Sequence, residues 1–123
     1  MAIVPEFLIK RIYQKGSLVI NEGSISLTLK NVLGPGLISG FNYVKINDVV
    51  FEAENVKFIT NGVEYSGVEV SEEKPIIFRL GQTGRLVLSG KDCPIKGLTQ
   101  ILIEAVNPEA GIVQLKAEDT LEG

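Results

Sequence analysis

Short runs of alternating apolar and polar residues, separated by turn residues, recur along the chain roughly every 8 to 12 positions. The sequence ISLTLK at residues 25–30 shows this pattern most clearly. Because successive side chains of a strand point to opposite faces, the alternation predicts a strand with one buried face and one solvent face. About nine such runs can be counted, the first at residues 6–13 and the last two at residues 98–106 and 112–117.

Turn residues divide these runs at regular intervals. Asn61 and Gly62 stand between the apolar runs at residues 56–60 and 63–65. An Asn-Gly pair favours a two-residue hairpin turn because both residues tolerate positive φ. Residues 61–62 are therefore expected to reverse the chain between two paired strands.

The pattern predicts one all-β domain over residues 1–123, since a single domain commonly has about 100 to 200 residues. Helix is expected only as about one turn at residues 70–74, where Pro75 would end it. The 27 Val and Ile residues against 5 Ala also favour sheet over helix. We expect an antiparallel β-sandwich with immunoglobulin-like or jelly-roll connectivity, between which the sequence does not decide.

Composition limits the chemistry of the chain. It contains no His and a single cysteine, Cys93, so the commonest proton-transfer and metal-binding side chains are nearly absent. We therefore expect no catalytic residue, no metal and no cofactor. The formal charge is −3, with 12 Lys and Arg against 15 Asp and Glu and no basic stripe, which argues against a nucleic-acid partner.

The first residues and the length of the apolar runs bear on where in the cell the protein works. The first ten residues, interrupted by Pro5 and Glu6, do not fit a secretory signal. No uncharged apolar stretch approaches the roughly 20 residues needed to span a bilayer. We expect a cytoplasmic protein with no membrane partner.

The chain has more apolar surface than the core of a sandwich needs. Residues 76–77 and 101–103 place large apolar side chains on both faces of their strands. A loop at residues 32–38 is also apolar, and extended apolar patches mark protein interfaces. The interface residues predicted in this loop are Val32, Leu33, Pro35, Leu37 and Ile38. The partner would be the chain itself, as a homo-oligomer, or a larger enzyme subunit.

A small-ligand or carbohydrate-binding module is the alternative function. Its candidate contacts are Tyr43, Glu52, Glu64 and Tyr65, which would line a cleft at a sheet edge. Aromatic rings and carboxylates are the side chains such a site needs for stacking and hydrogen bonding. A hydrolase that uses a pair of carboxylates is a third hypothesis, but no pair is oriented by the sequence.

The order of elements around residues 43–48, 55–58 and 61–66, continued through the turn at residues 90–97 into the last hairpin, resembles the small β subunit of C-glycoside deglycosidases. The resemblance covers about two thirds of the chain. It implies a small sandwich that accompanies a larger barrel-type subunit, which carries the metal and the catalytic groups. It assigns no catalytic residue to this chain.

Overall fold

A computed structural model of the chain describes residues 2–34 and 36–121. These residues form the predicted antiparallel β-sandwich, with one α-helix, α1 (Glu6–Ile12), and one short 3-10 helix, η1 (Ala53–Asn55). The strands are β1 (Ala2–Ile3), β2 (Val19–Asn21), β3 (Ser24–Lys30), β4 (Gly36–Ile38), β5 (Gly40–Ile46), β6 (Val49–Glu52), β7 (Val56–Thr60), β8 (Val63–Ser66), β9 (Ile76–Phe78), β10 (Thr83–Ser89), β11 (Gly97–Asn107) and β12 (Gly111–Leu121).

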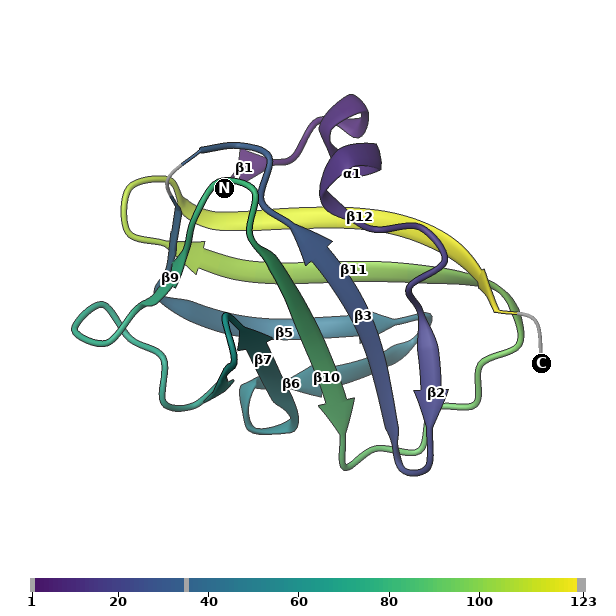
Figure 1. Ribbon diagram of the computed structural model, residues 1–123. Helices are drawn as coiled ribbons and strands as arrows, with labels where there is room; N and C mark the ends of the chain where they lie inside the picture. Colours follow the sequence, from purple (N-terminus) through teal and green to yellow (C-terminus); the bar gives the residue numbers. More distant parts are fainter. Residues whose placement is uncertain (1, 35, 122–123) are drawn as a thin grey trace.

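Two five-stranded sheets form the two layers of the sandwich (Figure 1). Sheet A has the order β1-β12-β11-β5-β6, and sheet B has the order β2-β3-β10-β7-β8. The short pair β4-β9 forms a third, two-stranded sheet. All the strand pairs are antiparallel except β1 with β12, which is parallel.

The connectivity is immunoglobulin-like. The order β2-β3-β10-β7 corresponds to strands A-B-E-D of that fold, and β12-β11-β5-β6 corresponds to G-F-C-C′. The chain crosses between sheets A and B after β1, after β3, after β6 and after β10, and it forms hairpins at β2-β3, β5-β6, β7-β8 and β11-β12. Strand order therefore decides between the two connectivities that the sequence left open.

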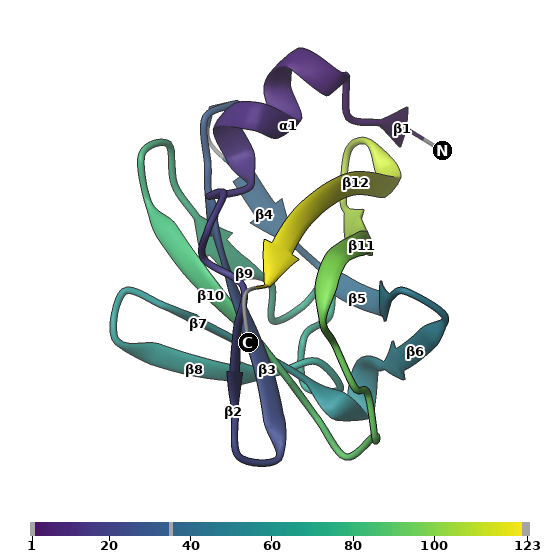
Figure 2. The same cartoon turned by 90° about the vertical axis from the view of Figure 1, so that its right-hand side faces the viewer.

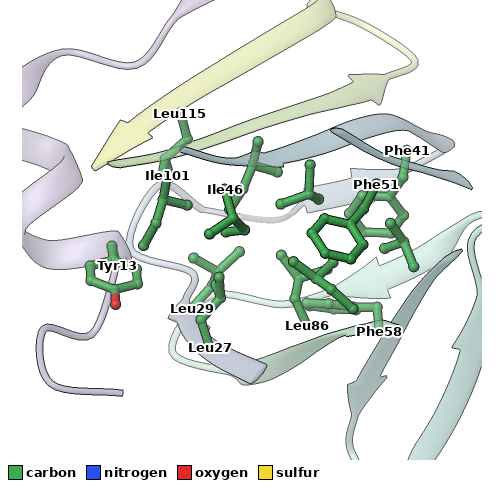
Figure 3. Packing of buried hydrophobic residues seen from close by; sticks show 14 of the residues in the cluster. Tyr13, Leu27, Leu29, Phe41, Ile46, Phe51, Phe58, Leu86, Ile101 and Leu115 are labelled. Atoms are coloured by element: carbon green, nitrogen blue, oxygen red, sulfur yellow. The ribbon is translucent and has the colours of Figure 1, made fainter. Parts of the chain in front are cut away.

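The inner faces of both sheets supply one continuous apolar core (Figure 3). Phe51 from sheet A and Phe58 from sheet B are completely buried. The ring of Phe58 also packs edge-on against Phe78, with ring centroids 5.2 Å apart, a favourable arrangement for aromatic pairs. Gly84 of β10 lies directly against the Phe58 ring, because a Cβ at Gly84 would overlap Cζ of Phe58.

The predicted turn at residues 61–62 is confirmed. Asn61 and Gly62 have φ angles of 52° and 74°, as a type I′ turn requires at both central positions. The turn joins β7 to β8, whose register pairs Thr60 with Val63.

The strand expected at residues 6–13 is wrong, because this segment is helix α1. Pro5 stands at the N-cap of the helix, where its missing N–H costs nothing. Leu8, Ile9 and Ile12 share the helix face that packs against the core, a spacing of one turn and not an alternation of two. The helical turn expected at residues 70–74 is also absent, and these residues form an open loop before β9.

Candidate functional site

The small β4-β9 sheet, whose place in the fold Figure 2 shows, carries an exposed apolar surface. Leu37 of β4 faces Ile77 of β9 across the pair, and their side chains are 40% and 51% exposed. Leu33 and Leu80, on the adjoining loops, are 60% and 63% exposed. We call Leu33, Leu37, Ile77 and Leu80 the Leu37–Ile77 surface.

Asn31 holds together the two loops that carry this surface. Its side-chain Nδ2 donates to the carbonyls of Gly34, at 2.6 Å, and Phe78, at 2.5 Å. Its Oδ1 accepts from the backbone N–H of Leu33 at 2.9 Å, and its carbonyl accepts from the backbone N–H of Gly81. A buried amide with these partners fixes the backbone on both sides of the surface, so its apolar side chains are presented by an ordered frame.

The structure divides the predicted interface residues into three groups. Leu33 and Leu37 are exposed and belong to the Leu37–Ile77 surface. Val32 and Ile38 are half-buried and pack against the core. Pro35 lies outside the described residues. Leu80 was missed by the sequence reasoning, because a leucine in a turn gives no periodic signal.

A polar cluster stands on the outer face of sheet A around Glu104 of β11. Its carboxylate, only 9% exposed as a residue, accepts hydrogen bonds from Asn42 Nδ2 at 2.9 Å, Gln114 Nε2 at 2.8 Å and the Tyr43 hydroxyl at 3.3 Å. The hydrogen bonds from Asn42 and Gln114, with a further one from Tyr43, outweigh the effect of burial and hold the pKa of Glu104 below its usual range. The cluster is thus a fixed anionic position held by neutral donors.

The predicted ligand-binding residues do not meet in one cleft. Tyr43 and Glu52 are cross-strand partners on the outer face of sheet A. Tyr65 lies in the other sheet, opposite the buried Phe58, and packs against the core. Glu64 precedes it in β8 and is exposed, so its side chain points to the opposite face. Glu104 joins Tyr43 and Glu52 in one row, a neighbour that the sequence reasoning missed.

Helix α1 is tied to the last strand through a buried pair. The Tyr13 hydroxyl donates to Asp119 Oδ2 at 2.5 Å, and the backbone N–H of Gly16 donates to the same oxygen at 2.8 Å. Burial alone would raise the pKa of Asp119, but the hydrogen bonds from Tyr13, Gly16 and Thr120 and the charge of Lys15 lower it overall. Burial, reinforced by the bond to Asp119, raises the pKa of the Tyr13 hydroxyl. The pair therefore fixes the segment after α1, near the start of the chain, to β12, the last strand.

Within residues 2–34 and 36–121, no group of three or more His, Cys, Asp or Glu side chains is placed to hold a metal ion. No helix in the same residues is both long enough and apolar enough to cross a bilayer. Cys93 is half-buried and unpaired, and burial, with the charge of Asp92 adding to it, raises the pKa of its thiol.

Fold and surfaces together define an immunoglobulin-like sandwich domain that carries an exposed apolar surface at β4-β9 and an ordered polar cluster on sheet A. The sequence matches the family described as hydroxymethylglutaryl-CoA reductase, N-terminal domain, over residues 8–122. The chain belongs to this family. The expected relationship to the small subunit of C-glycoside deglycosidases is therefore wrong, because the strand-turn-strand order on which it rested is common to many sandwiches. No curated protein matches the chain.

Proposed function

We propose that this chain is a noncatalytic docking domain that binds the catalytic part of a hydroxymethylglutaryl-CoA reductase through the Leu37–Ile77 surface. The observation that carries the proposal is the exposure of four large apolar side chains on a frame held by Asn31. Burying a fully exposed Leu or Ile side chain contributes roughly 1.5 to 3 kcal/mol, and each of these four, at 40 to 63% exposed, would contribute part of that. Four together would supply an apolar interface core.

The choice of partner rests on family membership. The family is described as the N-terminal domain of a reductase, which supports a role beside the part of the enzyme that performs the reduction. That part could be continuous with this domain or a separate polypeptide, and the surface would serve in either arrangement. A second copy of this chain is the competing occupant, because self-association would cover the same side chains.

Charged substitutions test the docking surface directly. We expect the double substitution Leu37→Asp and Ile77→Asp to weaken binding to the reductase's catalytic part by at least about 100-fold, because two desolvated charges would lie in an apolar interface. Binding would be measured by calorimetry with the purified catalytic part of the reductase from the same organism. Because both residues are exposed, circular dichroism should show an unchanged fold.

Leu98→Asp is the matched control. Leu98 is 62% exposed on β11, is absent from the Leu37–Ile77 surface and should leave binding unchanged. Equal loss of binding with Leu98→Asp, or no loss with the double substitution, would remove this surface as the docking site. A change in the native mass of the isolated chain on the double substitution would assign the surface to self-association.

We also propose that the domain works in the cytoplasm. Its one cysteine, Cys93, is a free thiol, and unpaired thiols are typical of reducing compartments. Fractionation of the source cells, with immunodetection of the chain, would test this location.

A further inference from the structure

A groove of about 990 Å³ runs between the N-terminal segment and sheet A. The segment formed by β1 and α1 lies beside β12 in both ribbon views (Figures 1 and 2). Residues 3–6, 9 and 10 line one side of the groove, and side chains of β5, β11 and β12 line the other. None of the residues of the Leu37–Ile77 surface lines it.

On the sheet side of the groove, two lysines flank a leucine. Lys45 of β5 and Lys116 of β12 are the cross-strand neighbours of Leu102 on β11. Neighbouring strands are about 4.8 Å apart, so the two lysine side chains leave the sheet roughly 10 Å from each other. The two ammonium groups can therefore contact one anionic group from two sides. The surface between them is the apolar side chain of Leu102.

Charge in the groove is opposite to the charge of the whole chain. Lys10 and Lys15 line it together with Lys45 and Lys116, against the carboxylates Glu6 and Glu118. Four ammonium groups and two carboxylates give the lining a charge of +2, whereas the chain as a whole carries −3. A concentration of positive charge in a concave surface attracts anions.

The other wall of the groove is mainly apolar. Ile3, Val4, Pro5 and Ile9 line it beside the charged Glu6 and Lys10, and Ile3 is largely exposed. The volume is within the range of small-molecule sites, about 300 to 1,000 Å³. An apolar wall facing a pair of lysines fits a ligand that has an aliphatic part and an anionic end.

We propose that this groove binds a small organic anion with an aliphatic chain. Its carboxylate or phosphate group lies between Lys45 and Lys116, and its chain packs along Leu102 and Ile3. The ammonium groups supply charge-assisted hydrogen bonds to the anion, and the aliphatic chain loses its contact with water against the N-terminal wall. This site is separate from the proposed docking surface, so either can fail without the other.

Octyl phosphate is the probe, used below its micelle-forming concentration in calorimetry at low salt. We expect saturable one-to-one binding, at least about tenfold tighter than inorganic phosphate, because the octyl chain adds apolar surface that the groove wall would bury. The double substitution Lys45→Gln and Lys116→Gln should weaken binding at least about tenfold, and so should Ile3→Ser. Lys57→Gln, an exposed lysine on β7 of sheet B, should change nothing.

Each of the remaining outcomes contradicts the proposal. No saturable binding of octyl phosphate, or binding that survives both the lysine substitutions and Ile3→Ser, would eliminate the site. Equal affinity for inorganic phosphate would reduce the groove to a nonspecific charged surface. Binding of phosphatidylglycerol vesicles without binding of free octyl phosphate would assign the lysines to a membrane surface. The three changed residues lie on the surface of the groove, and thermal unfolding would verify that each variant is folded.

Discussion

Asp119 is the buried carboxylate of β12 to which the segment that follows α1 is hydrogen-bonded. It is almost completely buried, yet it accepts hydrogen bonds from Tyr13 and Gly16. Its folded-state pKa is lowered, so its contribution to stability is present at pH values above its unfolded pKa, about 3.9, and is lost as the pH falls through the folded value. Acid should therefore loosen the attachment of α1 to β12.

We expect Asp119→Asn to reduce the free energy of unfolding at pH 7 by about 1 to 3 kcal/mol, because it removes a charged acceptor from buried donors. The variant should also lose less stability than the wild type between pH 5 and pH 2. Urea unfolding at both pH values measures the effect. Asp48→Asn, at an exposed turn, is the control and should follow the wild type. An unchanged acid dependence in Asp119→Asn would contradict the role given to this carboxylate.

At the scale of the element, β10 depends on the absence of a side chain at Gly84. A Cβ there would overlap the ring of Phe58, which is completely buried and cannot move aside freely. Gly84→Ala should therefore cost at least about 1 to 3 kcal/mol by overpacking. Gly40→Ala is the matched control in another strand, since its nearest side-chain atom would be 3.7 Å away. Equal thermal stability of the two variants would contradict the packing described for Phe58.

The packing of helix α1 leads to a second prediction about stability. Ile12 is buried, whereas Phe7 on the preceding turn is 69% exposed. Ile12→Ala should destabilise the fold by about 2 to 5 kcal/mol, and Phe7→Ala should stay within about 0.5 kcal/mol. Chemical denaturation of both variants gives the comparison. A large loss for Phe7→Ala would favour the alternating strand that the sequence pattern first suggested.

The elements that were predicted correctly are those fixed by local patterns. The alternation at residues 25–30 places Ile25, Leu27 and Leu29 in the core, as expected. Helix α1 was missed because its apolar residues fit both the period of a strand and one face of a short helix. Only the packing of the segment against the core decides between the two structures. The bond from Tyr13 to Asp119 joins positions 106 residues apart, which no local pattern encodes.

The candidate sites were predictable only in part, for the same reason. The loop at residues 32–38 was correctly identified as apolar, but which of its side chains face the core depends on the partner strand β9 and on Asn31. The groove was not predicted, since its lysines come from α1, β5, β12 and the turn after α1. Such surfaces exist only after the strands have taken their order in the sheet.

At the scale of the whole molecule, the sandwich presents two different surfaces. The Leu37–Ile77 surface is apolar and suits another protein, whereas the groove beside α1 combines lysines with an apolar wall. Because the two share no residue, a domain of this size could bind a partner and a small anion at the same time. The docking function proposed for the chain rests on the Leu37–Ile77 surface alone.

The most direct test is the native mass and composition of the particle that contains this chain, isolated from its own cells at moderate salt. We predict that the particle contains the catalytic part of hydroxymethylglutaryl-CoA reductase, either as a larger polypeptide in fixed ratio to this domain or continuous with it. Where the catalytic part is a separate polypeptide, the double substitution Leu37→Asp and Ile77→Asp should release it from the particle. A particle of 13.3 kDa, or a multiple of that mass with no other polypeptide, would contradict the docking role.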